Sequence, residues 1–136
     1  MKNILIISLL FATLISCSKE LGDLKYAETI PGGCALGKGT SLDNSLTSDI
    51  DKVTYKISND SLNIFVGFNA TCCGQYSTSS EIREDTIFIK ILTTQIGTCN
   101  CICYYTYNFK FKGSGENYKY KVTVDDTLNF TGEIKP

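Results

Sequence analysis

The chain has 136 residues, with 13 basic and 14 acidic side chains and a formal net charge of −1. It contains no run of Lys or Arg, so we expect no nucleic-acid partner, because such partners require clustered positive charge to displace counterions. Histidine and tryptophan are absent from the sequence, whereas seven cysteines are present. A cysteine nucleophile would lack its usual histidine base, and we therefore expect neither an enzyme nor a bound cofactor.

The first sixteen residues have the layout of a secretory signal peptide. Lys2 supplies the positive charge, an apolar run covers residues 4–15, and the small residue Ser16 precedes Cys17. This run of twelve residues is shorter than the roughly 20 that a membrane-spanning helix needs, so residues 1–16 are expected to be removed. Removal takes Lys2 away and leaves a formal net charge of −2.

The sequence Leu-Ile-Ser-Cys at residues 14–17 also resembles the lipobox of bacterial lipoproteins. The resemblance implies cleavage before Cys17 and acylation of that cysteine, for example with palmitate. More than one acyl chain gives stable anchoring, whereas a single chain binds a membrane only marginally. The expected location is the cell envelope, on the outer membrane. The alternative is an ordinary signal peptide followed by a free or disulfide-bonded Cys17.

Residues 17–33 predict a tether between the anchored cysteine and a single domain at 34–136. The segment from Ser18 to Gly33 is polar and irregular and ends in Pro-Gly-Gly, although an edge strand from Leu24 to Ile30 is an alternative. Residues 34–51 are rich in Gly, Ser, Asn and Asp, which predicts a long loop that Cys34 could fasten.

From Lys52 onward the sequence predicts an antiparallel all-β domain, because short alternating apolar segments are separated by turn residues. The first two strands form a hairpin, and the polar segment 74–85 is expected to be a loop. The clearest strand lies near the middle, where alternate residues from Cys99 to Phe111 share one face. The expected strands are 52–58, 62–70, 86–94 as a central strand, 99–112, 118–124 and 128–134.

Six or seven strands at this spacing predict a small antiparallel β-sandwich of immunoglobulin-like type, with a small β-barrel as the alternative. True immunoglobulin domains have a Cys-Trp-Cys spacing, which a chain without tryptophan cannot have. The prediction therefore concerns architecture and not membership of that family.

Three of the cysteines, Cys99, Cys101 and Cys103, alternate along one predicted strand. Residues two apart on a strand are about 6.8 Å apart, whereas disulfide-bonded Cβ atoms are about 3.8 Å apart. No two of the three should therefore bond each other while the strand is extended. Outside the cytoplasm, where disulfides persist, each would pair with one of the remaining cysteines, in an order the sequence leaves open. Those remaining cysteines are Cys34, Cys72 and Cys73.

The adjacent pair Cys72 and Cys73 raises a geometric difficulty. In extended backbone the two side chains would face opposite sides of the sheet, so only one could reach the alternating cysteines. A turn at Gly74 could redirect the other.

The alternative use of the cysteines is an all-thiolate site for a soft metal such as Cu(I) or Zn. The spacing is not that of a zinc ribbon, and the site would have to be loaded before the thiols oxidised. Structural disulfides are therefore the preferred interpretation. The candidate metal ligands are Cys72, Cys99, Cys101 and Cys103.

A second resemblance rests on the pattern Thr-Cys-Cys at 71–73 followed by Cys-Asn-Cys-Ile-Cys-Tyr-Tyr at 99–105. It is similar to that of a group of uncharacterised secreted or lipid-anchored proteins of Bacteroidota, and covers about residues 52–112. The resemblance implies a compartment and a class, and no activity.

Three triplets look like the O-glycosylation motif of those bacteria, and imply Ser61, Thr86 and Thr127 as candidate sites. Each has Asp before the hydroxyl residue and Ile or Leu after it. Asp followed by Ser or Thr is also ordinary where a turn enters a strand.

Taken together, these features predict a lipid-anchored envelope protein that binds an envelope protein or glycan or has a structural role. Aromatic side chains are the residues most often used at such surfaces, and Tyr76, Tyr104 and Tyr118 are the candidates.

Overall fold

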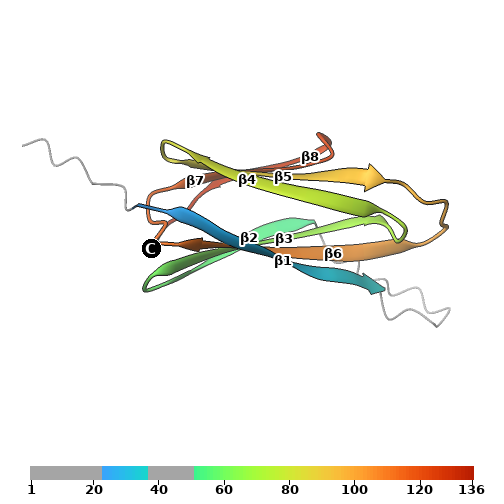
Figure 1. Cartoon of the computed structure of the whole chain (residues 1–136), viewed down its shortest axis with the longest axis horizontal. Helices are drawn as coiled ribbons and strands as arrows, with labels where there is room; N and C mark the ends of the chain where they lie inside the picture. Colours follow the sequence, from blue (N-terminus) through green and yellow to red (C-terminus); the bar gives the residue numbers. More distant parts are fainter. Residues whose placement is uncertain (1–22, 37–50) are drawn as a thin grey trace, which may run out of the picture.

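The computed structural model describes residues 23–36 and 51–136, which form two sheets stacked face to face (Figure 1). The predictions for residues 1–16, for Cys17 and for the loop at 37–50 lie outside the described residues. The strands are β1 (Lys25–Leu36), β2 (Lys52–Ser58), β3 (Ser61–Thr71), β4 (Gln75–Arg83), β5 (Thr86–Gln95), β6 (Ile102–Lys112), β7 (Lys119–Val124) and β8 (Leu128–Glu133). The predicted β-sandwich is confirmed.

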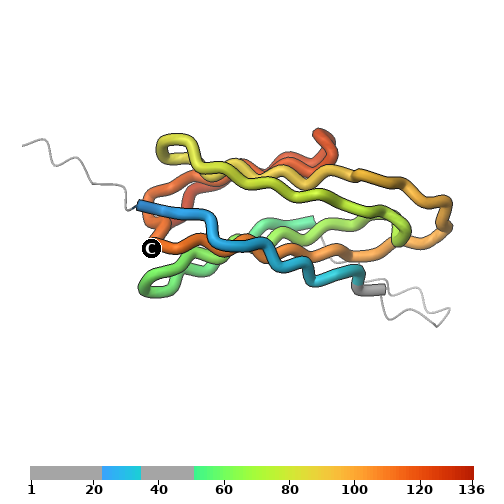
Figure 2. Tube along the Cα trace, in the orientation of Figure 1, coloured from blue at the N-terminus to red at the C-terminus, as the bar shows by residue number. Residues whose placement is uncertain are grey.

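Sheet A has the order β1-β6-β3-β2 and sheet B the order β4-β5-β7-β8. Every pair in sheet A is antiparallel, but β5 and β7 of sheet B are parallel, so the prediction of a purely antiparallel sandwich is wrong for that pair. The cause is the path of the chain. After β5 the chain crosses to sheet A, runs back as β6, and returns to sheet B in the direction of β5 (Figure 2).

Five of the expected strands occur close to their predicted positions. The hairpin of β2 and β3 is confirmed, with Ser58 paired to Ser61 across the turn. The prediction that residues 86–94 form a central strand is also confirmed, because β5 lies between β4 and β7. The segments predicted at 118–124 and 128–134 form the paired strands β7 and β8.

The loop expected at residues 74–85 is in fact β4, which pairs with β5 along its whole length. Its inward positions include Thr78 and Ser80 as well as the apolar Tyr76 and Ile82, so the hydrophobic alternation is weak in the sequence. Pairing with a strongly apolar neighbour decides its structure, since strand preference depends on context.

The irregular tether expected up to Gly33 is wrong from Lys25 onward, and the edge-strand alternative is correct. β1 pairs with β6, with register shifts next to Ala27 and Gly32. Pro31 is tolerated because an edge strand has a side on which no hydrogen-bond donor is needed. Proline and bulges also discourage another chain from pairing with this edge.

The strand expected at 99–112 begins only at Ile102, so Cys99 and Cys101 belong to the connection from β5. Within β6 the predicted alternation is confirmed, since its odd-numbered residues from Cys103 to Phe111 are buried. They meet Leu62, Ile64, Val66 and Phe68 of β3 and Ile87, Ile89 and Ile91 of β5 in one core. Phe68 stacks on Tyr105 and Tyr107, with ring centroids 5.7 and 6.1 Å apart.

Tyr55 of β2 joins the two sheets at one side of the sandwich. Its hydroxyl accepts a hydrogen bond from the backbone N–H of Lys135 at 3.1 Å, and its ring lies 6.4 Å from that of Tyr120 in sheet B. Over residues 23–36 and 51–136, no helix is long and apolar enough to span a membrane.

Candidate functional site

The six cysteines of the domain form three disulfides at one end of the sandwich. Each alternating cysteine bonds one of the other three, as predicted, with Cα–Cα distances of 5.4, 5.6 and 6.0 Å. The bonds are Cys34–Cys103, Cys72–Cys101 and Cys73–Cys99. We call this end of the molecule the cystine end.

A turn resolves the difficulty posed by the adjacent cysteines. The N–H of Gly74 donates to the carbonyl of Thr71 at 3.1 Å, which closes a turn around Cys72 and Cys73. Cys72 also donates its N–H to the carbonyl of Cys101 at 3.2 Å, so the two segments lie side by side before any sulfur is considered. The predicted turn at Gly74 is therefore confirmed.

The disulfides hold together the crossings between the two sheets and one edge strand. Two of them join the β3–β4 turn to the β5–β6 connection, which lie at the same end of the molecule (Figure 2). The third fastens edge strand β1 to β6. The cluster therefore acts as scaffold, and it fixes the relative position of the two sheets.

The metal alternative finds no support in this arrangement. Its four candidate ligands, Cys72, Cys99, Cys101 and Cys103, are distributed over all three disulfides, so none of the four offers a free thiolate to a metal. In the part of the chain that the structure describes, no group of three or more Cys, Asp or Glu side chains is placed to hold a metal ion.

The three tyrosines chosen from the sequence as exposed aromatics lie in different environments. Tyr118 is buried, with 5% of its surface exposed, so that choice is wrong. Tyr76 is half-buried and packs edge-on against Phe68, 5.3 Å between ring centroids, and so belongs to the core. Only Tyr104 lies on an outer face of the sandwich, among the residues of a groove.

This groove, which we call groove A, crosses the outer face of sheet A and has a volume of about 480 Å³. One row of paired residues runs across all four strands beneath it: Ile30, Asn108, Phe65 and Thr54. Ile30 and Phe65 are each 40% exposed, and both stand in this row. The sequence analysis missed both, because alternation alone assigned no role to the outward positions.

Two glycines produce the hollow. A Cβ atom added at Gly67 would overlap the hydroxyl of Tyr104, and one added at Gly32 would overlap the hydroxyl of Thr106. Both hydroxyl-bearing side chains therefore lie over backbone that carries no side chain. Gly in a strand often marks such a close approach.

Asn108 supplies an unusual polar atom to groove A. Its side-chain oxygen is buried and has no hydrogen-bond partner in the described part of the chain. Ile30 and Phe65 flank Asn108 on the two neighbouring strands of the paired row. A buried acceptor without a donor costs free energy, so its presence requires an explanation such as a bound water or ligand.

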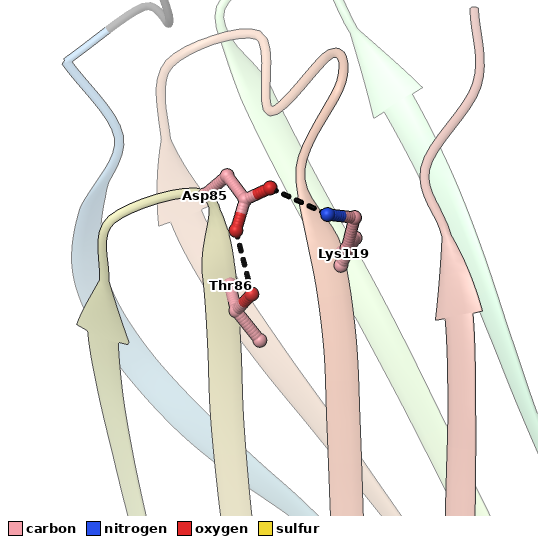
Figure 3. A network of polar contacts seen from close by, with 3 residues as sticks. All are labelled: Asp85, Thr86 and Lys119. Atoms are coloured by element: carbon pink, nitrogen blue, oxygen red, sulfur yellow. Dashed lines mark hydrogen bonds and ion pairs between the residues drawn. The ribbon is translucent and has the colours of Figure 1, made fainter.

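The candidate glycosylation triplets all begin in hairpin turns, which agrees with the ordinary interpretation of Asp before Ser or Thr. Thr86 donates its hydroxyl to the carboxylate of Asp85 at 2.8 Å, and Lys119 donates to the other carboxylate oxygen at 2.7 Å (Figure 3). Thr127 donates its hydroxyl to the carbonyl of Val124 at 3.2 Å, and Ser61 begins β3 half-buried. Glycosylation of the three residues stays a prediction.

The ion pair of Asp85 and Lys119 shifts the pKa of each group further from neutral pH. The hydrogen bond from Lys119, together with that from Thr86, lowers the pKa of Asp85. In turn the hydrogen bond to Asp85 raises the pKa of Lys119. The backbone N–H of Lys119 also donates to the carbonyl of Asp85 at 2.7 Å, so this contact marks the start of the parallel pair β5 and β7.

No family model, curated protein or solved structure matches this chain.

Proposed function

We propose that this protein is a lipid-anchored module of the cell envelope that binds a neutral glycan in groove A. The proposal has two parts, the anchor and the groove, and each rests on different observations.

Compartment and sequence support the anchor. Three disulfides in a domain of this size suit an oxidising compartment outside the cytoplasm. The lipobox-like sequence ending at Cys17 then supplies a means of attachment to the envelope.

The chemistry of groove A supports a glycan. Sugar rings present C–H faces that pack against aromatic rings and hydroxyl groups that require hydrogen-bond partners. Groove A offers Phe65 and Tyr104 for the first purpose, and Thr54, Thr106 and Asn108 for the second. Lys52 is the one charged residue among those lining the groove, so a neutral ligand fits best.

The single observation that carries the proposal is the buried, unpartnered side-chain oxygen of Asn108. Rotation of Ile30 or Phe65 away from Asn108 would open this oxygen to a sugar hydroxyl, which would donate to it and remove its cost. Because the groove is part of a sheet that the disulfides hold in place, little ordering is needed on binding, and such rigidity favours affinity.

A binding role is preferred to catalysis because the pKa shifts in this structure carry the groups concerned further from neutral pH. Burial raises the pKa of Tyr76 and of Tyr107, and the ion pair lowers the pKa of Asp85. General acid–base catalysis needs a pKa close to the working pH.

The test of groove A is affinity electrophoresis of the mature domain through gels that contain dextran, a mannan or a β-glucan. We expect at least one neutral polysaccharide to retard the domain, and Phe65→Ala and Asn108→Ala to weaken this retardation about tenfold. Phe88→Ala, on the outer face of sheet B, is the matched control and should migrate as the parent does. Equal retardation of all four proteins, or none with any polysaccharide, would overturn the proposal.

The anchor has a separate test. Cys17→Ser in the full chain should move the protein from the membrane fraction to the soluble extracytoplasmic fraction. Membrane association that persists in this variant would remove the anchor from the proposal and leave groove A untouched.

A further inference from the structure

The outer face of sheet B carries a second groove, of about 620 Å³, on the opposite side of the sandwich from groove A. We call it groove B. Residues from all four strands of sheet B line it, and most of the side chains that reach it are charged or polar. Its composition differs from that of groove A, where apolar surface predominates.

Two lysines stand in groove B, Lys90 and Lys121. Lys90 of β5 is paired in register with Thr123 of the parallel strand β7, and Lys121 of β7 with Phe88 of β5. The two ammonium groups thus come from neighbouring strands on the same face. In the described segments, no carboxylate lies within ion-pair distance of either lysine.

Arg83 adds a third cation, and its side chain is held in place from two directions. Its guanidinium lies 5.3 Å from the centre of the Phe88 ring and 2.5 Å from the carboxylate of Glu81. A guanidinium stacked on an aromatic ring keeps donors available in its plane, where a planar anionic group can be recognised.

The remaining polar groups of groove B suit hydroxyl groups. Thr123, only 8% exposed, lies at the floor, where its hydroxyl is 3.3 Å from the side-chain oxygen of Asn129. Glu81 and Asp126 also line the groove, and their carboxylates can accept hydrogen bonds from a ligand.

We infer that groove B binds an acidic saccharide, such as a segment of a uronic acid polymer. The carboxylates of the ligand pair with Lys90 and Lys121, and its ring hydroxyls donate to Glu81 and Asp126. The alternative anion, an anionic membrane surface, fits less well. Its lipid headgroups form a flat layer, whereas the cations of groove B line a hollow that a single saccharide chain can enter. Headgroup phosphates also lack the ring hydroxyls that would donate to Glu81 and Asp126.

This site lies beyond the proposed neutral-glycan groove and does not depend on it. Groove B uses charge on sheet B, whereas groove A uses apolar and amide groups on sheet A. Affinity for the acidic ligand should therefore fall as salt rises, while affinity for the neutral ligand should not.

The experiment measures binding of the mature domain to polygalacturonate, to dextran and to phosphatidylglycerol vesicles at two salt concentrations. We expect polygalacturonate to bind, and the double variant Lys90→Gln/Lys121→Gln to bind it about tenfold more weakly. The control is Lys56→Gln/Lys112→Gln, which removes the same charge from sheet A and should retain binding. Thermal unfolding of each variant should match the parent and so establish that it is folded.

Three results would overturn the inference. They are no binding of polygalacturonate, an equal loss of affinity in both double variants, and binding to vesicles in place of the saccharide. In each case the behaviour of Phe65→Ala toward neutral polysaccharides would still decide the proposal for groove A.

Discussion

The two ends of the sandwich are closed by different kinds of interaction. The cystine end has three covalent bonds between its turns and strands, together with hydrogen bonds such as that from Gly97 to Cys73 at 3.3 Å. The opposite end has apolar side chains instead, with at most 6% of any of them exposed: Leu24, Leu62, Tyr118 and Ile134. We call it the plugged end.

This difference shows how one small domain combines two sources of stability. Disulfides act largely by limiting the unfolded chain, so the cystine end is stable without deep burial. Cys101 is in fact exposed, and Cys72, Cys73 and Cys99 are only half-buried. The plugged end relies on packing in the folded state, and single side chains should matter more there.

The largest effect is expected from reduction of all three disulfides. Loss of one native disulfide in a small secreted domain costs about 2–5 kcal/mol, and the whole stability of such a domain is roughly 5–15 kcal/mol. Reduction should therefore remove most of the free energy of unfolding. Urea denaturation with and without a reductant measures this, and an unchanged midpoint would contradict the scaffold role of the cystine end.

At the plugged end, Leu62→Ala should cost about 3–4 kcal/mol, because it leaves a cavity in a site with no exposed surface. Leu62 also lies under Gly115, so the loss would loosen the connection from β6 to β7. Phe65→Ala on the outer face of the same strand is the control and should change the urea midpoint much less. Similar midpoints for the two variants would show that packing at the plugged end contributes little to stability.

Removal of the Cys73–Cys99 disulfide alone should cost less than that cavity. Cys73→Ala/Cys99→Ala leaves Cys72–Cys101 in place, and that bond still closes nearly the same loop. We therefore expect a loss of about 2 kcal/mol, at the low end of the usual range. The control is the bond from Cys34 to Cys103, whose separation of 69 makes the entropic effect of its removal larger. A reversed order in urea denaturation would indicate that loop length does not set the relative contribution of the two bonds.

Tyr105→Phe tests the hydrogen bonds behind the cystine end. The Tyr105 hydroxyl donates to the carbonyls of Thr71 at 3.1 Å and Gly74 at 3.3 Å, on either side of the adjacent cysteines. Its loss should cost about 1 kcal/mol in the free energy of unfolding. Tyr26→Phe removes an exposed hydroxyl bonded to Thr29, and should leave the stability within the error of the measurement. Equal losses of stability in the two variants would mean that the hydrogen bonds to the turn contribute no more than an exposed one.

The sequence predicts much of the cystine end because its chemistry is discrete. Alternation of Cys99, Cys101 and Cys103 excludes bonds among them, and the adjacent pair requires a turn, which Gly74 provides. These are local constraints that hold whichever way the sheets pack. The specific pairing depends on which strands become neighbours, and that is decided by the fold as a whole.

The plugged end and the grooves could not be predicted in this way. Leu24 is buried only because β1 joins β6, and the segment around it is mostly polar. The hollow of groove A likewise arises where Gly67 meets Tyr104, residues far apart in the chain. Outward positions on a strand carry little periodic signal, so their partners appear only when the register is known.

The smallest effect is expected at the contact of Asp85 and Lys119, near the plugged end, where exposure weakens the ion pair. The side chains are 37% and 55% exposed, so salt should screen the interaction. The pKa of Asp85 is lower in the folded than in the unfolded state, so its stabilisation is complete above the unfolded pKa near 3.8. It is lost as the pH falls through the lower, folded value. The raised pKa of Lys119 has the opposite pH dependence. Its stabilisation is complete below the unfolded pKa of about 10.5 and is lost as the pH rises above that value.

Asp85→Asn should therefore flatten the acid limb of the stability curve and have its largest effect between pH 5 and 8 at low salt. Urea midpoints from about pH 2.5 to 8, at low and high salt, measure this. Asp126→Asn, which removes an exposed carboxylate from the β7–β8 turn, is the control for the loss of one negative charge. If parent and Asp85→Asn lose stability in parallel as the pH falls, the contact does not help to hold β5 beside β7. That parallel pair would then be maintained by its buried residues alone, and the stability of the plugged end would come from apolar packing only.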